Sequence, residues 1–266
     1  MLISFWSTHH GQTGSTNNLI VLSLAIALSE KAKVLVSHSQ YGENQLERAL
    51  VSDIDSYMED SLCNYGLEPV IRLTKNGLLS IDNLSDYTIP LLKNHAYDLL
   101  AGIRRKLDGA QENAVYENAL LKSLELANQK YDYVFVDIAS GFLNELSRKI
   151  IDISDLVVIN INQNQYVLDS LKKSAWISQI SEKAMYCIGK YDPTIKANAK
   201  NICRKYKLGN VIRIPYSPQL IDLTNRGEIL ELFGRNILDN KKTKSEFFKE
   251  VLLSAREIVK KGNKRK

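Results

Sequence analysis

The fold of this chain is decided by residues 9–16, which read His9-His10-Gly11-Gln12-Thr13-Gly14-Ser15-Thr16. The stretch follows an apolar run at residues 2–6 and precedes a nearly continuous apolar segment at residues 19–28. A strand, a glycine loop and a buried helix in this order place backbone N–H groups around an anion such as phosphate. The two glycines allow a tight turn and a close approach of the backbone to that anion.

The loop departs from a standard phosphate-binding loop at one position. In that loop the last glycine is followed by lysine, and then by a serine or threonine whose hydroxyl binds Mg²⁺. Thr16 stands at the hydroxyl position, but Ser15 occupies the lysine position. Short glycine motifs often mark ordinary turns, so the interpretation depends on the predicted strand before the loop and the predicted helix after it.

Length and composition predict an ordinary globular chain. It has 266 residues, of which 44% are hydrophobic and 24% charged, and a net charge of +5 that permits an acidic partner without requiring nucleic acid. The three cysteines, Cys63, Cys187 and Cys203, form no paired metal spacing, which fits a reducing compartment. Residues 19–28 are too few to span a bilayer, and we see no basic leader. We predict a cytoplasmic protein with, at most, peripheral membrane contact.

Strands and helices alternate along the sequence. Strand-like runs lie at residues 2–7, 33–37, 97–102, 131–137, 156–161, 184–188 and 211–215. Helical spacing occurs at residues 113–129, from about residue 165, and at residues 197–206. This alternation predicts a single-domain α/β fold, with helices on both faces of a mostly parallel sheet.

Residues 1–240 are expected to form this domain, with residues 241–266 adding an amphipathic helix and a basic tail packed on it. Thr243 and Glu246 have the spacing of a capping box. The apolar stripe of the helix is Phe248, Val251, Leu252, Ala255 and Val259. Such a stripe usually packs on a core, and membrane-surface binding is the alternative. The basic end is expected to be solvated, with nucleic acid or acidic lipid as alternative contacts.

A carboxylate provides the second candidate for phosphate chemistry. The predicted strand at residues 131–137 ends on Asp137, four residues before Gly141. Because parallel strands end at one edge of a sheet, we expect Asp137 to meet the glycine loop there. Thr16 and Asp137 are then the candidate magnesium residues, and Gly141 is a candidate switch glycine.

These segments, in this order, resemble the ParA/MinD family of deviant-Walker P-loop ATPases, which dimerise around ATP. Residues 131–141 (YDYVFVDIASG) resemble the family's switch II segment, and residues 33–38 resemble its second strand and switch I. Residues 154–158 resemble a further core strand, and residues 214–218 with 225–227 resemble the segment that flanks the adenine. Residues 5–7 and the loop glycines resemble the TadZ/CpaE-like branch, which serves Tad/Flp pilus and secretion systems.

The resemblance implies a P-loop NTPase fold, ATP and Mg²⁺ as ligands, a homodimer, and protein partners in a pilus or secretion machine. The implied nucleotide-binding residues are His10, Gly11, Gln12, Thr13, Gly14, Ser15, Thr16, Pro215 and Tyr216. The implied switch residues are His38, Gln40, Asp137 and Gly141, with Thr16 and Asp137 at the metal.

Several positions depart from the family's pattern. The signature lysine falls on His10 and the Walker lysine on Ser15. The two switch I aspartates fall on His38 and Gln40, and the adenine-reading asparagine falls on Gly189. One cation at the transferring phosphate is worth roughly 10³–10⁵ in rate. The chain is therefore expected to be at most a weak ATPase, while backbone amides, the helix dipole and magnesium still favour binding.

Four functions fit the sequence to different degrees. The first is an ATP-binding, dimerising localisation or assembly factor with weak or absent hydrolysis. The alternatives are a pseudo-ATPase scaffold that binds no nucleotide and a DNA-partitioning ATPase. A reductase iron protein of the same fold requires paired cluster cysteines, which the three cysteines do not supply. A metal site at His9, His10 and His38 lacks completing ligands.

Overall fold

A mainly parallel sheet forms the centre of the computed structural model, which describes residues 1–42, 44–55, 64–105, 107–174, 176–238 and 245–263. The strand order is β3-β4-β2-β5-β1-β6-β7-β8, and only β3 runs antiparallel to its neighbour among these strands. The strands are β1 (Leu2–Ser7), β2 (Val34–His38), β3 (Ile89–Pro90), β4 (Tyr97–Leu100), β5 (Tyr133–Asp137), β6 (Leu156–Ile161), β7 (Ala184–Tyr191) and β8 (Val211–Pro215).

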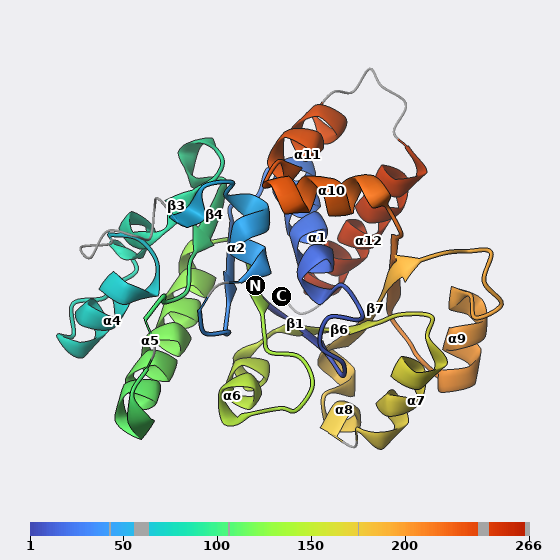
Figure 1. Ribbon diagram of the computed structural model, residues 1–266, viewed down its shortest axis with the longest axis horizontal. Helices are drawn as coiled ribbons and strands as arrows, with labels where there is room; N and C mark the ends of the chain where they lie inside the picture. Colours follow the sequence, from blue (N-terminus) through green and yellow to red (C-terminus); the bar gives the residue numbers. More distant parts are fainter. Residues whose placement is uncertain (43, 56–63, 106, 175, 239–244, 264–266) are drawn as a thin grey trace.

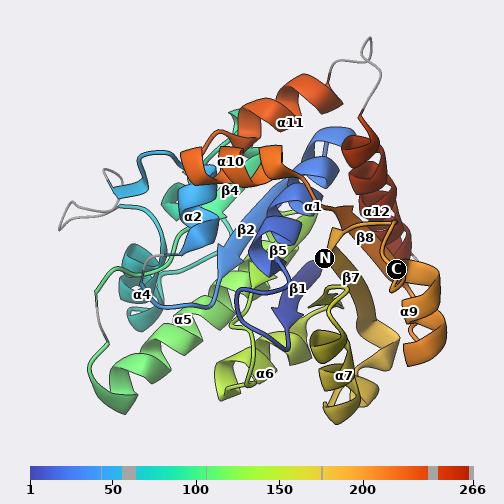
Figure 2. The same ribbon diagram turned by 45° about the vertical axis from the view of Figure 1, so that its right-hand side comes forward.

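Helices cover both faces of the sheet (Figures 1 and 2). One face carries α1 (Ser15–Ser29), α2 (Gln45–Leu50), α10 (Pro218–Arg226), α11 (Ile229–Ile237) and α12 (Glu246–Asn263). The other carries α4 (Leu67–Lys75), α5 (Gly109–Lys130), α6 (Glu145–Ile153), α7 (Gln165–Lys173), α8 (Trp176–Gln179) and α9 (Ala199–Tyr206). Three short 3₁₀ segments are η1 (Leu84–Tyr87), η2 (Lys93–His95) and η3 (Ser181–Lys183). The predicted fold class is confirmed.

Strand β1 lies between β5 and β6 and divides its side chains between two apolar cores. Ile3 and Phe5 face one core, whereas Leu2 and Trp6 face the other, because successive side chains of a strand point to opposite faces. Helix α1 follows β1 and is apolar on nearly all sides. It packs on the sheet and is also covered by α11 and α12, which explains why residues 19–27 are buried.

Two parts of the sheet differ from the sequence prediction. Strand β3 was not predicted, because it has only two residues and one is Pro90, which gives no alternating pattern and fits an edge strand. Strand β7 continues past Ile188, the predicted end, to Tyr191. Its pairing with β8 is irregular between those two residues, so Lys190 is carried to the edge of the sheet.

Helix α12 lies against α1 and β8. Phe248, Val251, Leu252 and Ala255 are buried, and Ile258 takes the next buried position, where the sequence prediction placed Val259. Val259 is half-buried beside that core. Ile258 and Val259 follow Val251 by seven and eight positions, and residues at both spacings lie on the same broad face of a helix. Thr243 lies outside the described residues. Within the described ranges, none of the helices has both the length and the apolar character needed to cross a bilayer.

Replacing Phe248 by alanine tests how much α12 contributes to stability. Phe248 is 3% exposed, and its ring meets that of Phe233 edge to face at a centroid distance of 5.1 Å. We expect Phe248→Ala to lower the free energy of unfolding by about 3–5 kcal/mol, measured by urea denaturation. The control is Leu253→Ala, on the same helix at a side chain that is 51% exposed, with an expected loss of about 0.5 kcal/mol or less. Equal losses would contradict this assignment of the core.

Candidate functional site

The candidate site lies at the carboxyl edge of the sheet, where the glycine loop joins β1 to α1. Strands β2 and β5 end beside it, with His38 opposite Asp137 and Asp137 opposite Phe5 in the strand register. Gly11 and Gly14 have φ angles of 70° and 71°, which glycine adopts without strain. Gly14 is also the residue before α1, so the loop places the N-terminal end of that helix, with its partial positive charge, at the site.

Two hydroxyl groups at the start of α1 hold the Asp137 carboxylate. Thr16 Oγ1 donates to Asp137 Oδ2 at 2.6 Å, and Ser15 Oγ donates to Oδ1 at 3.3 Å. Asp137 is only 1% exposed. Burial raises the pKa of Asp137 to about 6, although the two hydroxyl hydrogen bonds and the nearby His38 and His10 act in the opposite direction. The Asp137 carboxylate is therefore largely removed from water, so its ionised form is stabilised by a cation beside it.

Thr16 and Asp137 together fit Mg²⁺, which needs few protein ligands, better than they fit a metal that proteins enclose with three or more side chains. Thr16 lines the cavity and donates its hydroxyl proton to Asp137, so its oxygen keeps lone pairs with which it can bind a cation. Mg²⁺ typically keeps several waters and takes one or two protein oxygens together with substrate phosphate. The part of the chain that the structure describes contains no group of three His, Cys, Asp or Glu side chains able to enclose a metal.

A cavity of about 420 Å³ opens above this pair and the loop. The structure brings most of the predicted residues to its wall. These are His10, Gly11, Thr13, Gly14, Ser15, Thr16, Gln40 and Asp137. Gln12 and Gly141 lie outside the lining: the Gln12 side chain is exposed, and the Gly141 N–H donates to the Ser7 carbonyl at 2.8 Å.

Pro215 and Tyr216 line a second, smaller hollow next to the first. The two hollows share Gly14, Asn17, Lys190 and Ile221, so they form one continuous recess along the start of α1. Tyr216 is 55% exposed, and its N–H donates to the Tyr191 carbonyl at 3.0 Å. The predicted phosphate and adenine segments therefore adjoin one another.

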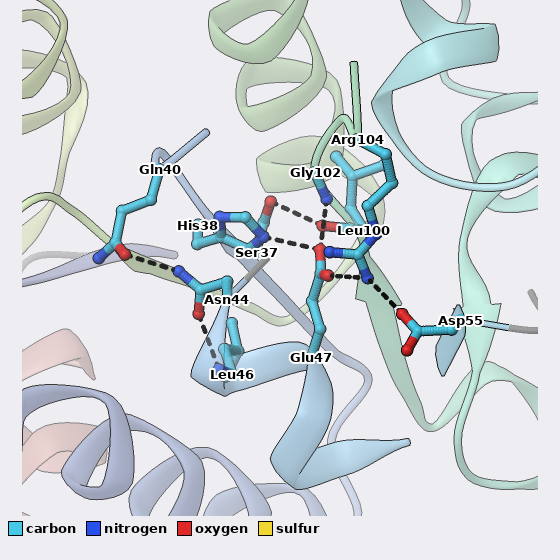
Figure 3. A network of polar contacts seen from close by, with 10 residues as sticks. All are labelled: Ser37, His38, Gln40, Asn44, Leu46, Glu47, Asp55, Leu100, Gly102 and Arg104. Carbon is cyan, nitrogen blue, oxygen red and sulfur yellow. Dashed lines mark hydrogen bonds and ion pairs between the residues drawn. The ribbon is translucent and has the colours of Figure 1, made fainter. Parts of the chain in front are cut away.

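His38 does not line the cavity and belongs instead to a network of polar contacts beside β2 (Figure 3). His38 is fully buried, and its Nε2 pairs with Glu47 Oε1 at 2.8 Å. The same carboxylate accepts from the Gly102 N–H at 2.6 Å and pairs with Arg104 at 2.9 Å. Burial opposes ionisation of Glu47, but these partners lower its pKa overall. His38 thus ties β2 to α2 through its contact with Glu47.

Gln40, two residues further on, does reach the cavity. Its side-chain oxygen accepts from Asn44 Nδ2 at 2.8 Å, and Asn44 in turn caps α2 by accepting from the Leu46 N–H (Figure 3). The two predicted switch I positions therefore have different surroundings. One is fixed in the core, and the other borders the recess without a carboxylate.

The sequence analysis missed two asparagines, Asn160 and Asn18, which hold the glycine loop by hydrogen bonds. Asn160, on β6, donates to Ser15 Oγ at 3.1 Å and to the Trp6 carbonyl at 3.2 Å. Its side-chain oxygen accepts from Asn18 at 2.9 Å. A polar residue near the end of a predicted buried strand was the available signal for Asn160, because that end lies at the loop edge.

The third missed residue is Lys190, which lines both hollows. It follows Gly189 on β7, at the same edge of the sheet. The available signal was a lysine two residues after a predicted apolar strand, but because that prediction ended at Ile188, it did not place Lys190 on the strand.

No protein-family model matches the sequence, and no curated protein matches it. Solved structures do match its fold. They include the MinC:MinD cell division complex of Aquifex aeolicus, at 17% identity and a TM-score of 0.69, covering 97% of this chain and 95% of that chain. A ParA family ATPase from Chlorobium tepidum TLS has 15% identity and a TM-score of 0.67, covering 96% and 97% of the two chains. The septum site-determining protein MinD of Pyrococcus horikoshii OT3, complexed with Mg-ADP, has 15% identity and a TM-score of 0.67, covering 100% and 98%.

The chain therefore has the fold of the MinD and ParA ATPases over nearly its whole length. At these identities the likeness shows the fold alone. The local geometry of the loop, Thr16 and Asp137 supplies the separate reason to assign a ligand.

The raised pKa of Asp137 predicts a specific pH dependence of stability. Between its ordinary value of 3.8 and about 6, the folded protein binds more protons than the unfolded chain, so stability falls as pH rises through this window. Without magnesium at pH 7.5, we expect Asp137→Asn to be more stable than wild type by about 1–3 kcal/mol, with no difference near pH 3.5.

Urea denaturation at several pH values measures this effect. The control is Asp86→Asn, at an exposed aspartate, which is expected to show no such pH dependence. A difference between Asp137→Asn and wild type that stays constant from pH 3.5 to 7.5 would show that the buried charge is not its cause.

Proposed function

We propose that this protein is a magnesium-dependent ATP-binding factor with weak or absent hydrolysis, acting in the cytoplasm. The observation that carries the proposal is the hydrogen bond between Thr16 and Asp137 beneath a loop with two left-handed glycines. This arrangement keeps the groups that bind phosphate and magnesium. A protein of the same fold is complexed with Mg-ADP, which supports the same ligand class here.

At the positions that catalyse phosphoryl transfer in the family that the sequence resembles, this chain has side chains of different chemistry. The Ser15 hydroxyl lines the cavity but is engaged by Asp137 and Asn160, and it carries no positive charge. Gln40 offers an amide where a carboxylate would orient water, and His10 replaces a permanently charged lysine. Binding without rapid turnover follows, because preorganised charge at the transferring group is the main source of rate in this chemistry.

We further propose that the protein dimerises and positions or assembles partner proteins. A MinD of the same fold is found in a complex with MinC. The side chain of Phe142, next to the switch glycine, is 88% exposed, which suits a contact surface at the loop edge. The loop sequence resembles the TadZ/CpaE-like branch, so a Tad/Flp-type pilus or secretion system is the machine we propose.

Calorimetric titration with ATP, with and without Mg²⁺, tests this function, and Ser15→Lys tests the explanation of slow turnover. We expect wild type to bind ATP only with magnesium, and Ser15→Lys to bind it about tenfold more tightly, because an added charge-assisted hydrogen bond reaches the phosphates. Phosphate release should stay low in both, since Gln40 still lacks a carboxylate. Ser15→Ala is the control for the lost serine hydroxyl.

Two results would contradict the proposal in different ways. Failure of wild type to bind ATP with magnesium would favour the nucleotide-free scaffold. Brisk phosphate release by wild type would show that the retained groups are sufficient for catalysis.

A second candidate function, nucleic-acid binding, is favoured by one surface. Lys172 and Lys205 lie 5.0 and 5.3 Å from the centre of the Tyr206 ring. Lys196, Arg204 and Lys205 line a hollow of about 480 Å³ between α7 and α9, which we call the basic groove. All four cations are exposed, and Asp169 is the carboxylate near them, because the charges of Lys205 and Lys172 contribute to lowering its pKa. The basic C-terminal end, by contrast, continues into residues 264–266, outside the described part.

Reversing two charges of the basic groove tests this candidate. If it binds duplex DNA, Arg204→Glu with Lys205→Glu should weaken binding and reduce the slope of log affinity against log salt by about two. Fluorescence anisotropy measures both quantities. The matched control is Lys31→Glu with Lys33→Glu, two exposed lysines at the opposite edge of the sheet. Equal effects of the two double variants would show only a general charge effect.

A further inference from the structure

We propose that Lys190 supplies, from β7 of the same chain, the phosphate-neutralising charge that the glycine loop lacks at Ser15. This inference rests on the proposed nucleotide-binding function and assigns a residue to it. It is carried by the position of the Lys190 side chain over the loop.

The backbone around Lys190 is fitted closely to the loop. A Cβ atom at Gly189 would lie 2.3 Å from the Thr13 carbonyl oxygen and 2.6 Å from the Asn18 side chain, so only glycine allows this approach. Lys190 itself has a left-handed φ of 51°, next to the irregular pairing of β7 with β8. The turn directs its side chain across the loop: Cε lies 3.7 Å from the position of a Cβ on Gly14.

Lys190 is also suited to this task by its charge. Among the described residues that line the recess, it is the one with a permanent positive charge. It forms no ion pair with a carboxylate in the described ranges, and its side chain is exposed, so the ammonium is available to a ligand. A lysine carries its charge on a flexible four-carbon stem, which lets it follow a phosphate from a neighbouring strand.

The position of Lys190 between the two hollows allows one competing role. Its alkyl stem could pack against a base in the hollow of Pro215 and Tyr216 while its charge stays in water. The two roles differ in the ligand part that they affect. A phosphate role acts on inorganic tripolyphosphate, which has no base, and a packing role acts on adenosine, which has no phosphate.

The experiment is calorimetric titration of the full chain with Mg-ATP, Mg-tripolyphosphate and adenosine. We expect Lys190→Gln to weaken Mg-ATP and Mg-tripolyphosphate each by about tenfold, with adenosine unchanged. Lys190→Arg should stay within about threefold of wild type, because it keeps the charge. The matched control is Lys31→Gln: Lys31 is also an exposed, left-handed lysine, with φ 53°, but lies at the opposite edge of the sheet. Far-ultraviolet circular dichroism checks that each variant is folded.

Three results would overturn the inference. Unchanged affinity of Lys190→Gln for tripolyphosphate, with wild type binding it, would reject Lys190 as a phosphate ligand and leave the proposed function intact. Weakened adenosine binding alone would assign Lys190 to the base. Failure of wild type to bind either Mg-ATP or Mg-tripolyphosphate would reject the proposed function together with this inference.

Discussion

The buried carboxylate of Asp137 is the constraint on which the site depends. It sits at the end of β5, next to β1, and is held by the first two residues of α1. An ionised carboxylate in this position is costly unless donors or a cation face it. The hydroxyl groups of Thr16 and Ser15 supply the donors, and the start of α1 supplies a partial positive charge. The same contacts hold the glycine loop against the sheet.

Hydrogen bonds between polar groups on both sides of the Asp137 carboxylate connect the segments that meet at this edge of the sheet. Asn160 and Asn18 fill the space beneath the loop with matched hydrogen bonds, so the buried polar atoms there have partners. On the other side, Glu47 joins His38, the Gly102 N–H and Arg104 in one cluster. The recess is consequently lined by the glycine loop, by the start of α1 and by the carboxyl ends of strands such as β5 and β7.

The side chains at a few single positions set the chemistry of this edge of the sheet. Ser15 retains the backbone geometry of the loop but turns its side chain toward Asp137 and Asn160. Lys190, on β7, approaches the loop at Gly14. A lysine can neutralise a phosphate only if its ammonium group lies close to it in space. Because several parallel strands end at the same edge of the sheet, a lysine on any of them can lie near that edge.

The sequence by itself determined the order of strands and helices, the buried character of α1, and the meeting of the glycine loop with Asp137. These features follow from local rules: apolar runs form strands and buried helices, and parallel strands end at a common edge. Only the tertiary structure decided that His38 is enclosed by Glu47 and Gly102 while Gln40 borders the recess. Only the structure brought Lys190 to Gly14, because that approach depends on an irregular strand pairing and on close backbone packing at Gly189. Such contacts between individual side chains leave no periodic signal in a single sequence, so their partners are fixed by packing.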